Sequence, residues 1–183
     1  MAHEVRKCDC PCEQDDEIFR YTESVRAYIQ REDGTIFQNN SDKHAYVIIS
    51  EFLSAAKETV RIFCGKLSAR IYERLLPAFM LAKNRGVDVQ VVAASDYGDL
   101  ESDELKKYLN ENGMLRCRPE LCKYPHFLLV DSKRFRLEVS QEKKEAIVCA
   151  SATSDGAKEI ACGLANLFPR IWGKSRTSPA NAQ

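Results

Sequence analysis

The amino-acid sequence predicts an α/β fold in which helices flank a mixed β-sheet. Stretches rich in β-branched and aromatic residues alternate with amphipathic helical stretches along most of the 183 residues. Late in the chain, two strand-like stretches follow each other directly, which indicates an antiparallel hairpin added to the alternating order. A chain of this length can bury a core of ordinary size as one domain.

The first third of the chain predicts two helices with a short strand between them, followed by a buried strand. Residues 15–31 carry apolar side chains at helical spacing and acidic residues in the first turn. The stretch TIFQ, 35–38, predicts the short strand. A polar cluster at 39–42 can cap a second helix that runs to about Lys57. The stretch TVRIFCG, 59–65, is typical of a buried strand.

The rest of the chain predicts three more helices and five more strands. Ser68 is expected to cap a helix that bends near Pro77 and ends near Asn84, with Gly86 at the cap position. The further strands are expected at 87–94, 114–118, 126–131, 134–140 and 145–150. The further helices are expected at 103–112 and at about 155–168, with Trp172 packing beyond the last one. A two-residue turn, Ser132 and Lys133, is expected to join the hairpin strands.

These elements divide the chain into four parts. We expect a flexible cysteine-rich segment at 1–14, an N-terminal helix at 15–33, an α/β domain at 34–173 and a polar tail at 174–183. The N-terminal segment is charged and has no apolar signal-peptide core, and the chain has no apolar run of about 18 residues. We therefore expect a cytoplasmic protein with no membrane association.

The charge balance excludes a protein whose overall charge attracts nucleic acid. Lys and Arg together number 27, as do Asp and Glu. A basic patch must therefore be local. The candidate phosphate-binding or nucleic-acid-binding residues are Lys123, Lys133, Arg134 and Arg136, with Arg116 and Arg118 nearby in sequence. With the aromatic side chains of Tyr124 and Phe135 they could follow a phosphate backbone. The alternative is that these cations only prevent edge-to-edge strand association.

Eight cysteines are many for a chain of this length. In a cytoplasmic protein they are reduced thiols or metal ligands more often than disulfides. Cys8, Cys10 and Cys12 form a C-x-C-P-C run whose thiolates could share a zinc ion, with His3 or Cys122 as the fourth ligand. The alternative is a poorly ordered terminal segment without metal. No other cofactor is expected.

The order of elements from about residue 34 to 172 resembles the phospholipase D-like superfamily, and in particular its small single-domain nucleases. The stretches that carry the resemblance are FLSAAKETVRIFCG, AKNRGVDVQVVAASD, MLRCR and HFLLVD. The resemblance implies a phospholipase D-like α/β domain.

The catalytic signature of that superfamily is largely replaced. The signature is His-x-Lys, four residues, Asp, then Gly-Ser-x-Asn; the histidine attacks phosphorus and the lysine holds phosphate oxygens. Alignment on Asp131 places Tyr124 at the histidine position and His126 at the lysine position. The Gly-Ser and Asn positions are taken by Glu138, Val139 and Gln141. The candidate catalytic residues are therefore His126, Tyr124 and Asp131.

These replacements predict a catalytically degenerate domain. A tyrosine hydroxyl is protonated at neutral pH and is a poor nucleophile without an activating base. A neutral histidine binds phosphate weakly, and an inward-pointing Glu138 would oppose the negative charge of the reacting group. The resemblance then implies a binding or assembly subunit, as a homodimer or docked on a larger partner.

The alternative is an active phosphodiesterase, most simply a nuclease, with a rearranged site. A bulge or a shift of one turn would make His126 the nucleophile, and two copies of it would face each other in a homodimer. Lys123, Lys133 or Arg134 would then hold the phosphate. If neither residue has a catalytic role, His126 is expected to donate a hydrogen bond to a backbone carbonyl group, and Asp131 is expected to stabilise the turn through its side chain.

Overall fold

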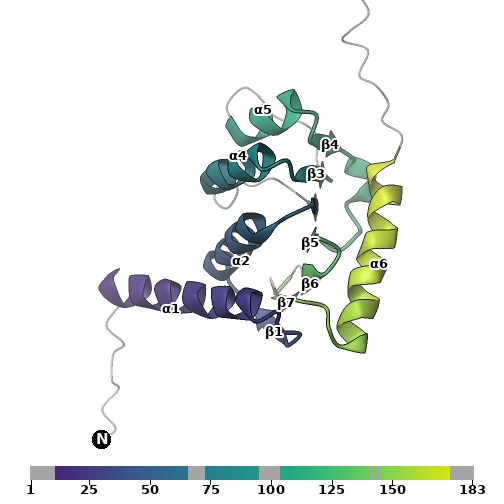
Figure 1. Ribbon diagram of the computed structural model, residues 1–183. Coiled ribbons are helices and arrows are strands. Elements are labelled where there is room, and N and C mark those ends of the chain that lie inside the picture. Colours follow the sequence, from purple (N-terminus) through teal and green to yellow (C-terminus); the bar gives the residue numbers. More distant parts are fainter. Residues whose placement is uncertain (1–10, 66–72, 95–103, 141, 144, 174–183) are drawn as a thin grey trace, which may run out of the picture.

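The computed structural model describes residues 11–65, 73–94, 104–140, 142–143 and 145–173. Within these ranges the chain forms one mixed sheet with helices on both faces, as the sequence predicts (Figure 1). The elements in chain order are α1 (Pro11–Gln30), β1 (Ile36–Asn39), α2 (Asp42–Ala55), β2 (Thr59–Cys64), the 3-10 turn Glu73–Leu75, α4 (Leu76–Asn84), β3 (Asp88–Ala93), α5 (Glu104–Glu111), β4 (Leu115–Cys117), the 3-10 turn Pro119–Leu121, β5 (Phe127–Val130), β6 (Arg134–Ser140), β7 (Glu145–Cys149) and α6 (Asp155–Trp172).

The sheet joins a parallel half to an antiparallel half. Its strand order is β1-β7-β6-β5-β2-β3-β4. Strands β2, β3 and β4 are parallel, whereas β5 is antiparallel to β2 and begins the antiparallel series through β6 and β7 to β1. The carboxyl ends of β2, β3 and β4 therefore lie at the same edge of the sheet as the start of β5.

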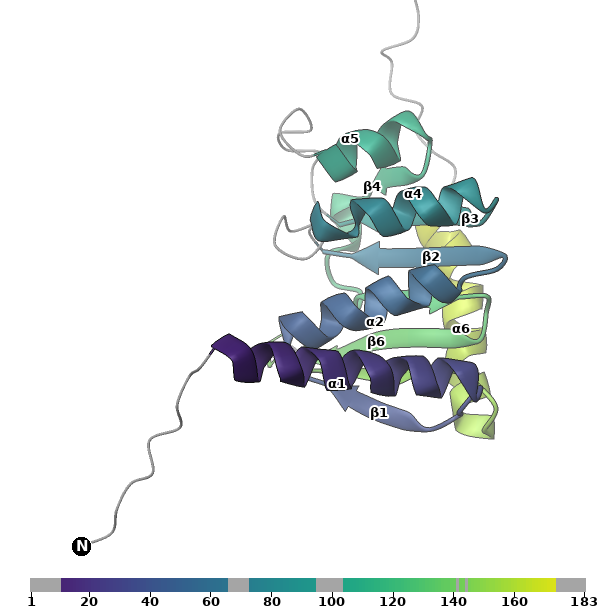
Figure 2. The ribbon, with the colours of Figure 1, turned by 60° about the vertical axis from the view of Figure 1, so that its left-hand side comes forward.

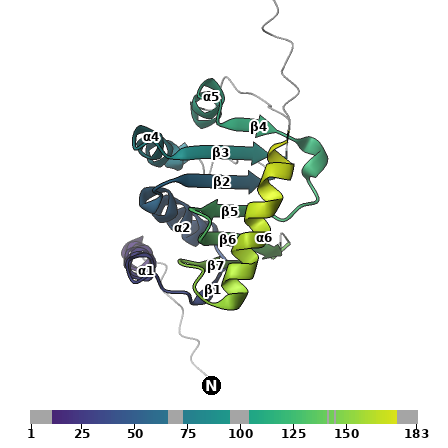
Figure 3. The same ribbon diagram turned by 45° about the vertical axis from the view of Figure 1, so that its right-hand side comes forward.

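Two apolar layers hold the helices on the sheet. Helices α1, α2, α4 and α5 cover one face, with α1 beside α2, while α6 alone crosses the other face (Figures 2 and 3). The first layer includes the fully buried Phe52 and Phe79. The second includes Phe63, Phe127 and Phe168. Alternate residues of β2 and β5 belong to opposite layers, because successive strand side chains point to opposite faces.

Several helix boundaries differ from those the sequence predicts. Helix α1 begins at Pro11 rather than residue 15, since proline is well tolerated in the first turn of a helix. Pro77 likewise lies in the first turn of α4 and does not bend a longer helix. The expected start of that helix, 68–72, lies outside the described residues. Ser41 caps α2 as expected, with its hydroxyl accepting the His44 N–H at 3.1 Å.

Helix α6 continues four residues beyond the expected end at 168 and includes Pro169 and Trp172. Two arginines, one in β4 and one directly after it, bind the last carbonyl groups of α6. Arg116 Nη1 donates to Trp172 O at 2.7 Å, and Arg118 Nη1 donates to Ile171 O at 3.1 Å. The Arg116 guanidinium also lies 4.0 Å from the centre of the Trp172 ring. These contacts satisfy the carbonyls that end the helix.

No helix among the described residues is long and apolar enough to cross a membrane.

The connection between β5 and β6 is held by several side-chain hydrogen bonds. Asp131 and Ser132 both have a left-handed backbone, with φ of 50° and 55°. The Asp131 carboxylate accepts the backbone N–H groups of Lys57 at 3.1 Å, Glu58 at 2.8 Å and Thr59 at 3.0 Å. Arg134 Nη1 lies 3.2 Å from the same carboxylate, and both side chains are buried, 4% and 8% exposed respectively. The carboxylate thus joins the hairpin to the start of β2.

We expect Asp131→Ala to lower the free energy of unfolding by about 3 kcal/mol, because it leaves three N–H groups and a buried guanidinium without their acceptor. Asp131→Asn keeps one acceptor oxygen but removes the charge, and an intermediate loss is expected. Urea unfolding followed by circular dichroism measures both. A loss below about 0.5 kcal/mol for the alanine variant would contradict this account of the turn.

Candidate functional site

The candidate site lies at the edge of the sheet where the parallel strands end. Phe63 of β2 pairs with Phe127 of β5, so His126 lies beside the end of β2. In open α/β sheets, ligands bind outside the carboxyl ends of the parallel strands. The fold therefore brings His126 to the edge where such sites are found.

The imidazole of His126 pairs with a carboxylate on the neighbouring strand. Nδ1 of His126 lies 2.6 Å from Oε2 of Glu138, and the two side chains are 29% and 12% exposed. The backbone supports the pairing, because Glu138 N donates to His126 O at 2.9 Å. Nδ1 is thus in close contact with Glu138, although Oε2 of Glu138 accepts no hydrogen bond of good geometry among the described residues.

The turn between β5 and β6 is one residue longer than the two-residue turn that the sequence predicts, and this places Glu138 opposite His126. The hairpin connection consists of Asp131, Ser132 and Lys133, with β5 pairing Val130 to Arg134. His126 and Glu138 are then equally far from Ser132 in sequence. A two-residue turn of Ser132 and Lys133 would instead have placed Val139 opposite His126. A shift of one residue in a strand moves every side chain to the other face, so the extra turn residue decides which side chain meets the imidazole.

Gly65, directly after β2, leaves the space in which the imidazole lies. A Cβ atom at this position would be 2.5 Å from Nε2 and 2.8 Å from Cε1 of His126. Both distances are shorter than side-chain atoms tolerate. Nε2 therefore lies against the backbone of Gly65, on the opposite side of the ring from Glu138.

Arg136 brings a positive charge to the same site. It is the β6 neighbour of Leu128, and its Nε donates to Oδ1 of the fully buried Asn39 at 3.0 Å. The hydroxyl of Tyr21, from α1, is also buried. Burial raises the pKa of Tyr21 to about 12, and the positive charge of Arg136 opposes this with a smaller effect. Tyr21 therefore stays protonated at neutral pH, while Arg136 is held in place by Asn39.

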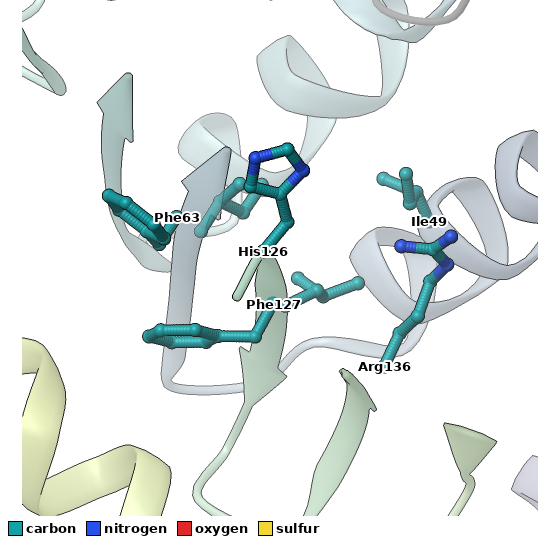
Figure 4. A pocket seen from close by; sticks show the side chains of 7 residues that line it. Ile49, Phe63, His126, Phe127 and Arg136 are labelled. Carbon is teal, nitrogen blue, oxygen red and sulfur yellow. The ribbon is translucent and has the colours of Figure 1, made fainter. Parts of the chain in front are cut away.

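A small hollow lies between these groups (Figure 4). In that view the His126 ring lies between Phe63 and Phe127 on one side and Ile49 and Arg136 on the other. The residues that line it are Ile49, Ile62, Phe63, His126, Phe127, Leu128 and Arg136. It has room for about one water molecule. No sugar or nucleobase fits inside it, so a large ligand would have to lie across the edge.

Tyr124 and Lys123 lie in the connection from β4 to β5. Both side chains are exposed, and Tyr124 is 42% accessible. The Tyr124 ring meets the buried Phe63 edge-on, with 6.4 Å between centroids and an interplanar angle of 86°. Phe63 also contacts the His126 ring, with centroids 6.2 Å apart. Three predicted site residues, Lys123, Tyr124 and His126, thus lie together.

The other predicted site residues lie elsewhere. Asp131 and Lys133 follow β5, whereas His126 precedes it, so they lie at the opposite end of that strand. Lys133 Nζ is 2.6 Å from Glu32 Oε1, and Arg134 is buried against Asp131. Phe135 is fully buried and is not a surface aromatic residue. The four predicted phosphate-binding residues therefore do not form one surface, and only Lys123 and Arg136 lie near His126.

The predicted zinc ligands cannot be placed. Cys8, Cys10 and the side chain of Cys12 lie outside the described residues. Among the residues that are described, no group of three or more His, Cys, Asp or Glu side chains could hold a metal ion. The zinc site stays a prediction.

Sequence reasoning missed three contributors to this site. Gly65 and Asn39 carry no chemical signature, and Tyr21 is distant in sequence. The role of Glu138 could have been found, because hairpin register follows from the connection length. The signal is Asp131, which accepts a left-handed backbone more readily than most residues and so belongs to the turn rather than to the strand.

Comparison with known proteins gives a structural likeness only. No protein-family model matches the chain, and no curated protein matches it in sequence. Solved structures superpose with much of it, including TrmBL2 and Nuc. TrmBL2, an archaeal chromatin protein with a novel mode of DNA binding, has a TM-score of 0.59 and 14% identity over 90% of this chain. The present chain spans 62% of TrmBL2.

The second structure is Nuc from Salmonella typhimurium, a phospholipase D family member. The match has a TM-score of 0.58 and 17% identity, and it covers 79% of this chain and 97% of Nuc. Likeness at this level of identity establishes architecture and leaves activity open. Together with the mixed sheet and its flanking helices, it shows that the chain has the phospholipase D-like fold.

We expect Gly65→Ala to displace the His126 ring from Glu138, because the new methyl group would overlap Nε2. The overlap is expected to cost about 1–3 kcal/mol of stability. The ¹⁵N chemical shifts of the imidazole report whether Nδ1 still carries its proton. Gly156→Ala is the matched control, because a Cβ there meets nothing within 4 Å and the substitution favours the helix. Unchanged ¹⁵N shifts in Gly65→Ala would refute the close approach.

Proposed function

We propose that the chain is a catalytically degenerate phospholipase D-like domain that binds nucleic acid at the edge carrying His126 and acts as a binding or assembly subunit. The observation that carries this proposal is the 2.6 Å pair between His126 and Glu138. At the position where the superfamily signature has a phosphate-binding lysine, this chain has a ring held by a carboxylate.

The pair works against phosphodiester turnover. Negative charge builds up on the phosphoryl oxygens as the nucleophile attacks, and an active site stabilises it with fixed positive groups. Here the largely buried carboxylate of Glu138 lies next to the ring and opposes that charge. Tyr124, at the position of the signature nucleophile, has its ring against Phe63. No general base is found beside its hydroxyl among the described contacts.

Local cations support nucleic-acid binding. Lys123 is exposed, and Arg136 lines the hollow beside His126. Because the net charge of the chain is zero, any attraction for a phosphate backbone must come from such a local group. The structural likeness to TrmBL2, a protein described as binding DNA, is compatible with this function.

The assembly role forms the second half of the proposal. The superfamily signature implies two copies of the site, and a single domain of this fold has one. We infer that the chain forms a homodimer or docks on a larger protein partner. In TrmBL2 the matched part belongs to a longer chain.

The second candidate function is an active phosphodiesterase centred on His126. The contact between His126 and Glu138 also favours this candidate, because the carboxylate could orient the imidazole. A nucleophile or base oriented by a third group is the usual arrangement of catalytic histidines. Glu138 would play that orienting part, with Nε2 as the attacking atom and the second His126 of a homodimer as the acid. A monomer in solution would remove this shared-site mechanism.

Turnover of a model phosphodiester and of labelled DNA, with divalent metals chelated, separates the two candidates. We expect the rate with the wild-type protein to equal that with His126→Ala and Glu138→Gln, because none of these side chains acts in a reaction. If the wild-type protein turns over substrate and both variants lose about 10²-fold or more, the domain is an enzyme and the degenerate assignment fails.

Binding tests the other part of the proposal. Lys123→Ala is expected to weaken DNA binding several-fold. It is also expected to reduce the slope of log Kd against log salt concentration by about one. Lys133→Ala is the matched control, because it removes the same charge at the opposite end of β5. Fluorescence anisotropy over a salt series measures both. Equal losses for the two variants would place the nucleic acid elsewhere.

A further inference from the structure

Tyr124 is an exposed aromatic residue whose position is set before any ligand arrives. Its ring is 42% exposed, while its other side meets the buried Phe63 edge-on. Its backbone N–H donates to Leu121 O at 3.0 Å, which closes the turn, and Pro125 restricts the residue that precedes it. A large ring held in this way loses little conformational entropy when a ligand covers it.

The surroundings of Tyr124 match one kind of ligand. Lys123, the residue before Tyr124, is exposed, and no carboxylate in the described part of the chain pairs with it. His126 and Arg136 line the hollow, and the His126 ring also contacts Phe63. An exposed aromatic ring with lysine and arginine side chains nearby is an arrangement that proteins use for single strands, with phosphates on the cations and a base stacked on the ring.

The size of the hollow limits how such a ligand could bind. It has room for about one water molecule, so a base cannot insert beside His126 and would have to lie outside the hollow, where the exposed Tyr124 ring offers a face for stacking. The bases of a duplex are stacked on one another, with only their edges exposed. An unpaired base, or the terminal base pair of a duplex, can therefore cover Tyr124, whereas interior base pairs cannot.

We propose that Tyr124 is a nucleobase-stacking residue and that the His126 edge takes unpaired, single-stranded nucleic acid in preference to duplex. This rests on the proposed function, because it assumes that nucleic acid binds at this edge. It adds the class of ligand and the residue that selects it. It also gives Tyr124 a binding role in which its hydroxyl group does not react.

Three DNA ligands test the inference by fluorescence anisotropy: a single strand, the same strand with abasic sites, and the duplex. The abasic strand keeps every phosphate but has no base to stack. The wild-type protein is expected to bind the intact single strand about tenfold more tightly than the abasic strand. Tyr124→Ala should remove that difference, Tyr124→Phe should keep it, and Lys123→Ala should weaken both strands equally. Because Tyr124 is exposed, unchanged circular dichroism is expected for its variants.

The outcomes separate the inference from the function on which it rests. Equal affinity of the wild-type protein for intact and abasic strands, or tighter binding of duplex, would overturn stacking at Tyr124 and leave nucleic-acid binding standing. A Tyr124→Ala variant that still prefers the intact strand tenfold would also overturn it. If no ligand binds at low salt, both the proposed function and the inference fail.

Discussion

The register of the β5–β6 hairpin is the constraint on which the rest of the structure depends. It is set where the Asp131 carboxylate takes three backbone N–H groups at the start of β2 and faces the buried Arg134. This contact joins the antiparallel half of the sheet to the parallel half at one point. A slip of one residue there would turn Phe127 and Leu129 away from α6 and move Leu128 out of the opposite layer. Both apolar cores therefore rely on a polar interaction at the edge.

The same register brings the site residues together. Because three residues form the connection, Glu138 lies across from His126 and Arg136 across from Leu128, at the far end of the hairpin from Asp131. One end of the hairpin thus serves folding, with its charges paired and buried. The other end carries charges that are partly exposed. This separation explains why Asp131, although it matches the superfamily signature, has so many structural partners.

The fold could be predicted well from local patterns. All seven strands and the order of the helices follow from apolar periodicity, turn residues and caps, because each of these acts over a few neighbouring residues. Features that depend on contacts between distant segments of the chain were predicted less accurately. Helix α6 extends past its expected end because Arg116 and Arg118, some fifty residues earlier, bind its carbonyls. Arg134 and Phe135 looked like surface groups in the sequence, but they are buried.

By itself, the sequence determined the α/β class, the resemblance to phospholipase D-like proteins and the place of His126 before a buried strand. Tertiary structure decided which side chains meet there. Glu138 reaches the imidazole through strand pairing, Gly65 after β2 leaves room for the ring, and Asn39 of the outermost strand β1 holds Arg136. Segments far apart in the chain supply these contacts. No pattern within a short window contains them, because the distance between two side chains is set only when the strands that carry them are aligned.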